Sequence, residues 1–322
     1  MTTAVVPPAH HPPARLRAAG AALAALGGVA LAVQGRINGQ LGHELHDGVF
    51  AALISFSIGS VLLLSVSPIL PAVRAGVGRL RKALRDQELR PWQLLGGSCG
   101  AFLVTTQGVT VSFLGVAVFT VAVVAGQIVC SLPVDRAGIG PGGPQPITLP
   151  RALGASLAVI AVIISVSDHG AVTVSGGLWW AVLPAVAGCL LAWQAAVNGQ
   201  VRMAAANVVV PTIVNFLVGT SALVLAAVVS VIIRGWPATP PGQWWLYTGG
   251  ALGIVAIITA VTAVRVTGVL LLGMSSVAGQ LTGALLLDVF VPTAGGLSPT
   301  SVIGIALTMV AVGIAAIHVR PR

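Results

Sequence analysis

Carboxamide side chains recur at matching intervals in the two halves of a very apolar chain. Gln34 and Asn38 lie four residues apart, and 160 residues later Gln194 and Asn198 repeat the same spacing. A primary amide offers both hydrogen-bond donors and an acceptor, so it can hold a polar solute without any change of charge. The chemistry that these residues offer is therefore non-covalent recognition.

A second amide is repeated together with a glycine before it. Gly126 and Gln127 recur 153 residues later as Gly279 and Gln280. The glycine lets another backbone or a ligand come close to the glutamine. Each glutamine stands near the middle of an apolar segment, where it either lines a central cavity or bonds to a neighbouring helix. The residue types leave both interpretations open, although the duplication favours the cavity.

The spacing of the first motif indicates where its amides lie. Residues four apart share one face of a helix, so each glutamine and its asparagine would line one mouth of a pathway. The alternative is that each asparagine and the glycine after it, Gly39 or Gly199, end their helix. That alternative leaves Gln34 and Gln194 unexplained, and we therefore expect these two to line a cavity.

Three charged residues accompany the amides. Arg36 has Ala196 as its counterpart, and we expect its long side chain to reach the outer interface, with an anchor for an anionic substrate group as the alternative. Asp135 and Asp288 repeat at the ends of two apolar segments, where each can pair with a neighbouring loop. Coupling of transport to protons through these carboxylates stays a second interpretation.

Motifs for catalysis, cofactors and metals are missing from the sequence. We find no HExxH, no phosphate-binding loop with its lysine and no GxSxG, so the sequence predicts neither an enzyme nor a cofactor. The outer segment 43–47, HELHD, is expected to be a solvated loop, with weak metal binding as the alternative. The cysteines lack metal-ligand spacing and are interpreted as small buried apolar residues: Cys99, Cys130 and Cys189.

The composition requires a membrane protein. The chain is 56% hydrophobic and 7% charged, with a mean hydropathy of +1.00. Apolar runs of about 20 residues cross a bilayer core of roughly 30 Å as helices. Ten such spans are predicted: 18–40, 49–70, 92–113, 115–135, 150–168, 177–199, 208–233, 243–264, 266–290 and 299–318. Small residues open the third and eighth spans (Gly96 and Gly100, Gly249 and Gly253), which is typical of closely packed helices.

The ten spans form two halves, 18–168 and 177–318, after a disordered cytoplasmic tail, 1–17. All Lys and Arg residues except Arg36 and Arg234 fall on one side if both termini are cytoplasmic. Five spans are an odd number, so the second half is inverted relative to the first. The basic loop 71–90 is interpreted as an orientation signal, with an amphipathic helix on anionic lipid as the alternative. The net charge of +9 does not indicate nucleic-acid binding, because the basic residues sit in short loops.

These motifs resemble the drug/metabolite transporter superfamily, and within it the inner-membrane exporters of the YdcZ type, in a form with two fused halves. The resemblance rests on the duplicated Q-x3-N-G-Q, followed by F-x2-G, and on the duplicated Gly-Gln run that ends in Asp. It implies a bacterial cytoplasmic membrane, alternating access and a central cavity lined by both halves. The matching positions are Gln34, Asn38, Gln127, Asp135, Gln194, Asn198, Gln280 and Asp288. Arg36 and the Asp135-Arg136 pair depart from the pattern.

The sequence thus predicts an all-α secondary transporter that exports a small molecule. A non-transporting membrane scaffold or assembly protein is the first alternative, and an intramembrane lipid-modifying enzyme is the second. The expected partners are a small-molecule substrate and membrane lipid, and a homodimer is left open. Apolar replacement of Gln127 and Gln280 separates the interpretations, since a scaffold tolerates it and a transporter loses flux.

Overall fold

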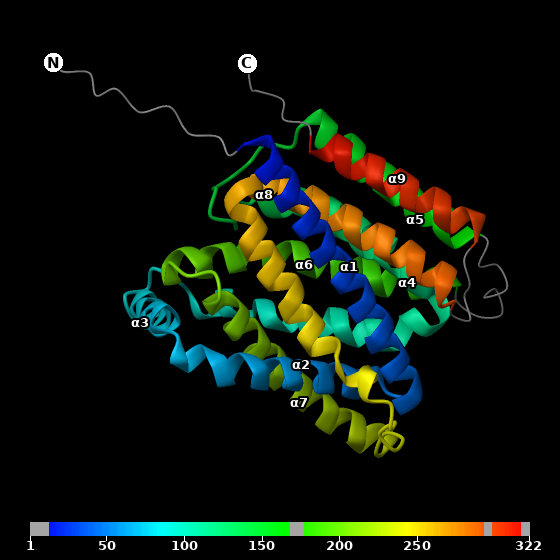
Figure 1. The fold of residues 1–322 in the computed structure, drawn as a ribbon, viewed down its shortest axis with the longest axis horizontal. Coiled ribbons are helices and arrows are strands. Elements are labelled where there is room, and N and C mark those ends of the chain that lie inside the picture. The colour runs from blue at the N-terminus through cyan, green and yellow to red at the C-terminus, as the bar shows by residue number, and fades with distance from the viewer. Residues whose placement is uncertain (1–12, 168–176, 293–297, 317–322) are drawn as a thin grey trace.

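The computed structural model describes residues 13–167, 177–292 and 298–316, and this part of the chain is all helical (Figure 1). The α-helices are α1 (Ala14–Leu45), α2 (Gly48–Val66), α3 (Pro71–Arg85), α4 (Gly96–Arg136), α5 (Leu149–Ser167), α6 (Gly177–Ala205), α7 (Val210–Arg234), α8 (Gly249–Phe290) and α9 (Pro299–Ala315). Short 3-10 turns lie at η1 (Ser67–Ile69), η2 (Pro91–Leu95) and η4 (Trp244–Tyr247). Most of the expected tail, residues 1–12, lies outside the described residues, and α1 begins four residues before the expected first span.

The two motif helices do not end at their Asn-Gly steps. Helix α1 continues past Gly39 to Leu45, and α6 continues past Gly199 to Ala205. The interpretation of these glycines as helix C-caps is therefore wrong. The glycines serve close contacts instead, because a Cβ on Gly39 would meet Val111 at 2.6 Å and one on Gly199 would meet Pro141 at 2.8 Å.

Equivalent side chains start the second helix of each half. Asp47 accepts hydrogen bonds from the Val49 and Phe50 amides at the start of α2. Asn207, 160 residues later, accepts from the Val209 and Val210 amides at the start of α7. Both side chains satisfy amides that have no partner inside the helix. The segment 43–47 thus ends in a helix cap, a role that its sequence did not indicate.

Two helices are too long to be single membrane crossings. Helix α4 has 41 residues and α8 has 42, whereas about 20 fill a bilayer core. The backbone of α4 leaves the helical region at Gly115, where φ is 79° and ψ is 162°, which only glycine adopts without strain. Figure 1 shows α8 as two arms, yellow and orange, that meet at an angle. Each long helix holds two of the expected spans.

Seven helices of the described chain are long and apolar enough to cross a membrane, with the segment Pro91–Arg136 counted once. Two shorter apolar helices, Gly249–Ala260 and Pro299–Ala315, fall below that length. Multiple membrane-spanning helices are therefore present. The number of ten crossings stays a prediction.

The two halves pack through equivalent pairs of helices. Helix α1 of the first half packs along α8 of the second, and α6 of the second half packs along α4 of the first. Gly28 on α1 lies against the Ser276 carbonyl oxygen, and its counterpart Gly188 lies against the Val123 carbonyl oxygen, so a Cβ at either position would overlap the backbone. These reciprocal contacts relate the halves by an approximate two-fold axis.

The same symmetry holds at the α2–α7 crossing. The ring of Phe216 fills the space beside Gly59, and the ring of Phe56 fills the space beside Gly219. The two ring centroids are 5.1 Å apart. The hydroxyl groups of Ser60 and Thr220 are 2.9 Å apart, within hydrogen-bond distance. The repeated F-x2-G thus forms a self-complementary contact between the halves.

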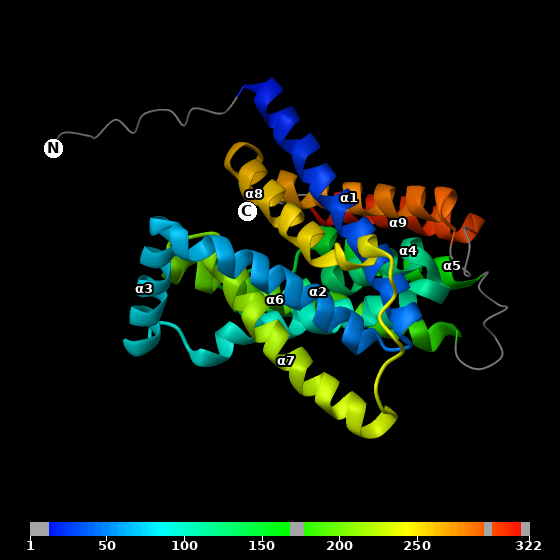
Figure 2. The same cartoon turned by 60° about the horizontal axis from the view of Figure 1, so that its bottom comes forward.

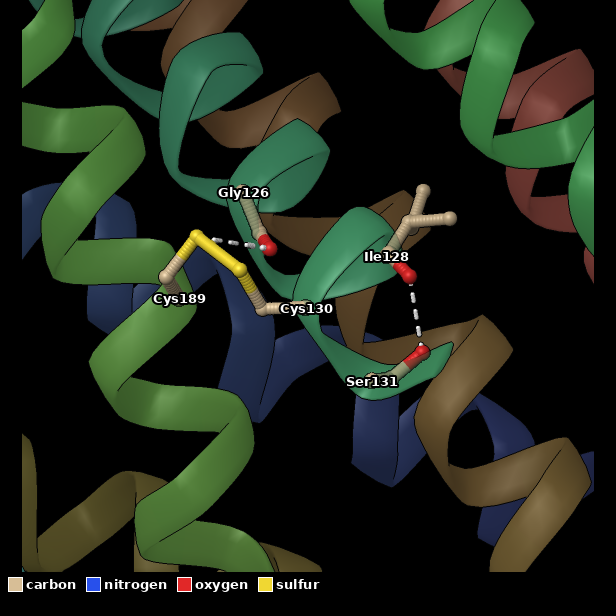
Figure 3. Close-up of a disulfide and its surroundings, with 5 residues drawn as sticks. All are labelled: Gly126, Ile128, Cys130, Ser131 and Cys189. Carbon is tan, nitrogen blue, oxygen red and sulfur yellow. Dashed lines mark hydrogen bonds between the residues drawn. A yellow bond between two sulfur atoms is a disulfide. The ribbon is translucent and has the colours of Figure 1, made fainter. Parts of the chain in front are cut away.

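Two of the three cysteines form a disulfide, which corrects the interpretation of all three as isolated apolar residues. Cys130 of α4 and Cys189 of α6 are bonded, with their Cα atoms 4.9 Å apart (Figure 3). Cys99 is buried and free, as the sequence predicts. The pairing was not visible in the sequence because 59 residues separate the two positions. Only the packing of α6 along α4 brings them together.

Helix α3 covers one end of the molecule, with α5 and α9 packed together at the opposite side (Figures 1 and 2). The apolar face of α3, which includes Val73 and Leu80, packs on Val201 of α6 and Val210 of α7. Arg79 donates a hydrogen bond of 2.8 Å to the Ala205 carbonyl oxygen at the end of α6. The basic loop therefore does form an amphipathic helix, but its apolar face is covered by the protein.

Candidate functional site

A cavity of about 610 Å³ lies between the halves, on the side of the molecule that carries α3. Gln194 and Asn198 line it from α6, and Asn215 lines it from α7. Phe56 and Phe216 form an aromatic part of the wall. Among the described residues that line this cavity, Arg202 alone is ionisable, and its side chain is exposed. The described wall of this cavity is thus largely apolar, with three carboxamide side chains and little charge.

The amides of this cavity are placed by the glycines of α4. A Cβ on Gly96 would lie 3.1 Å from Asn198 Oδ1 and 3.2 Å from Asn215 Oδ1. A Cβ on Gly100 would likewise lie 3.4 Å from Nε2 of Gln194. The Gly-xxx-Gly spacing of α4 therefore makes room for the Gln-xxx-Asn spacing of α6. The sequence predicts both patterns but not that they face each other.

Asn215 is a site residue that the repeat analysis missed. It stands directly before the repeated Phe216, and its counterpart in the first half is Ser55. Oδ1 of Asn215 and Oε1 of Gln194 are buried and have no hydrogen-bond partner among the described residues. The signal in the sequence was a polar residue at helical spacing from Thr212, which lines the same cavity.

The counterpart amides of the first half are packed rather than open. Gln34 is 8% exposed and Asn38 is fully buried. Asn38 donates a hydrogen bond of 2.8 Å from Nδ2 to Oε1 of Gln107 on α4. A Cβ placed on Gly253 would lie 2.9 Å from Gln34 Nε2. The equivalent distance in the second half, from a Cβ on Gly100 to Gln194 Nε2, is longer, at 3.4 Å. Oδ1 of Asn38 and Oγ of Ser55, which both lie beside Gly249, have no hydrogen-bond partner in the described part of the chain.

The two mid-span glutamines do not share a cavity in this structure. Gln127 lines a second cavity of about 420 Å³, together with Ser131 and Asp135. Ala195 and Pro141 border both this cavity and the amide-lined one, so the two are neighbours. Gln280 is half-buried on α8 and lines neither cavity. The cavity interpretation has geometric support for Gln127 and none for Gln280.

The two aspartates have different surroundings. Asp288 is 2% exposed, and its carboxylate accepts hydrogen bonds from the Val116 and Ala117 amides at 3.1 and 2.7 Å. These are the first amides after the backbone break at Gly115, so Asp288 caps the second arm of α4. Asp135 is half-exposed and forms an ion pair with Arg151 instead.

Arg36 faces the protein rather than the solvent alone. Its side chain is half-buried, and its Nε atom is buried without a hydrogen-bond partner among the described residues. The guanidinium group is attracted by the charge of Asp288. This attraction acts between the first half and the end of α8, and Arg36 is not among the residues that line the amide-lined cavity.

A family model described as "Putative inner membrane exporter, YdcZ" matches the chain over two regions, 19–164 and 179–314. The two matches together cover most of the chain. This chain belongs to the YdcZ family. Its two matched regions confirm the fused two-repeat form, and the apolar helices agree with a multi-pass protein of the inner membrane. No curated protein matches the chain.

Proposed function

We propose that this YdcZ-family protein is a secondary transporter that exports a small molecule by alternating access. One observation carries the proposal: the amides of the second half line a cavity, while the equivalent amides of the first half are packed against α8. In an inverted repeat, such a difference between equivalent residues is what one state of a two-state carrier looks like.

The proposal includes ten membrane crossings with both termini in the cytoplasm. The break in α4 and the bend in α8 would allow each to cross twice, and α9 would complete the second half. Helix α3 and its exposed basic residues would then lie on the cytoplasmic side: Arg74, Arg81, Lys82 and Arg85. Arg202 lies on that side as well, so the amide-lined cavity would face inward.

Exchange of roles between the halves would produce the outward-facing state. Gln194 and Asn198 would close onto Gly100 and Gly96, as Gln34 and Asn38 now pack on Gly253 and Gly249. The glycine contacts favour such sliding because no side chains interlock there. A ligand in the cavity would shift the balance only by binding one state better than the other.

Proteoliposome efflux of labelled small solutes tests the proposal. Gln194→Leu keeps the side-chain volume but removes the amide, and we expect at least a tenfold loss of flux. Ser221→Leu on the exposed face of α7 is the matched control, and it should leave the flux unchanged. Equal flux in a correctly folded Gln194→Leu protein would remove the cavity from the mechanism, and no flux with any solute would favour a scaffold.

A further inference from the structure

We propose that the amide-lined cavity selects an uncharged, planar solute that carries a hydrogen-bond donor beside an acceptor, as in a primary amide or a nucleobase edge. This inference rests on the transport proposed above. It adds the chemical class of the transported solute to that proposal. The class is inferred from the cavity side chains that differ between the two halves.

The sequence of the second half lacks one amide partner that the first half has. In the first half Asn38 is held by Gln107. The counterpart of Gln107 at the offset of 153 is Ala260, which lines the cavity and has no polar side chain. Asn198 therefore lacks the amide that fixes Asn38. The difference would persist in any conformation, because it lies in the residue types.

A second exchange adds an amide to the same cavity. Asn215 replaces the Ser55 of the first half. Three carboxamides thus converge on one space, and two of them have a buried oxygen without a partner. A buried polar atom without a hydrogen bond costs about 1–3 kcal/mol, and rotation of either amide toward the cavity would let a bound solute with complementary groups remove that cost.

The charges around the cavity exclude ionised solutes. No carboxylate lines it among the residues that the structure describes, so an organic cation would lose its hydration and meet no counter-charge there. The cationic group found among these lining residues, Arg202, is exposed, so water and salt screen it. An anion would gain little there. An uncharged solute avoids both losses and keeps its hydrogen bonds to the amides.

The aromatic wall favours a planar shape. Phe56 and Phe216 both line the cavity, with their rings tilted by 37° and only 8% and 9% exposed. Contact with Gly219 and Gly59 holds these rings in place. A flat solute can lie against such rings while its edge bonds to the amides. The cavity volume of about 610 Å³ admits one or two rings.

Three solutes of one shape and different charge test the inference: benzamide, benzamidinium and benzoate. Binding to the purified full-length protein is measured by saturation-transfer NMR and competition, and flux is measured separately in proteoliposomes. We expect benzamide to bind at least tenfold more tightly than either ion. Tighter binding of benzamidinium or benzoate, or equal binding of all three, would overturn the inference. Flux of the ion would in that case still support a transporter.

Asn215→Asp places the test at the cavity itself. The substitution keeps the side-chain shape and adds a carboxylate, so we expect about a tenfold loss of benzamide affinity and a gain for benzamidinium. Ser221→Asn on the exposed face of the same helix is the control and should change neither. An unchanged preference in a folded Asn215→Asp protein would show that binding lies elsewhere and would overturn the assignment.

Discussion

The carboxylate of Asp288 has a structural role that its sequence counterpart does not share. It caps the second arm of α4 at the break after Gly115, whereas Asp135 pairs with Arg151. The two aspartates therefore occupy equivalent positions in the repeat but different chemical surroundings. A shared function in ion coupling has no support from these contacts.

Removal of this cap should destabilise the protein. Asp288→Ala leaves the Val116 and Ala117 amides without their acceptor, and we expect a loss of about 1–2 kcal/mol in stability. Asp288→Asn keeps an acceptor oxygen and should lose less. Thermal unfolding in detergent measures both variants. Equal losses would contradict the capping role and would point to the negative charge, which also attracts Arg36.

The sequence predicted the duplicated amides but not their partners. Gln34, Asn38, Gln194 and Asn198 were recognised because each pair repeats. Asn215 was missed because its counterpart is a serine, and a search for identical residues passes over it. The partner of Asn38, Gln107, lies 69 residues away on another helix, so only the packing reveals it.

At the scale of the elements, the α4–α6 pair differs from the equivalent α8–α1 pair by a covalent bond. Gly126 and Gly188 bring α4 and α6 into backbone contact, and Cys130 and Cys189 join them one turn further on (Figure 3). At the equivalent place Gly283 lies against Val29, with no cysteine. The second arm of α4 is thus tied to α6 by a covalent bond, and the equivalent contact between α8 and α1 has no such bond.

Peptide mapping under non-reducing conditions should detect this bond. We expect a peptide pair that contains Cys130 and Cys189, together with a free thiol at Cys99. Cys99→Ser should leave the linked pair in place, whereas Cys189→Ser should abolish it. Two free thiols at Cys130 and Cys189 in protein isolated with rapid thiol blocking would contradict the pairing.

The helices themselves were largely predictable, because long apolar runs have few alternatives in a membrane protein. Most of each expected span lies in an observed helix, but the spans predicted to begin at 92, 208 and 243 start before α4, α7 and α8, and residue 70 is not helical. Residues 168 and 317–318 fall outside the described residues. Continuity was not predictable: α1 and α6 extend beyond their Asn-Gly steps, and helix α3 packs on the protein. Each difference depends on contacts between distant segments, which a pattern along one helix does not contain.

At the scale of the whole molecule, the proposed orientation in the membrane rests on the distribution of charge. The exposed basic residues of α3 lie at one end, and the segment between α7 and η4, residues 235–243, carries no basic residue. A reporter protein that is active only outside the cytoplasm should therefore be active when inserted at Gly242 and inactive when inserted at Gly78 of α3. Both positions have open space around them, since no atom lies within 4 Å of a Cβ placed on either glycine. The reverse pattern would contradict inward-facing termini and an inward-facing cavity.

The most direct test of the central claim is counterflow. Proteoliposomes are loaded with an unlabelled solute that shows flux and then diluted into a trace of the labelled solute. An alternating-access carrier with its site at Gln194 and Asn198 should give a transient accumulation of label, and Gln194→Leu should abolish that accumulation while Ser221→Leu retains it. Downhill flux without any accumulation in the wild-type protein would contradict alternating access and indicate a continuous pore.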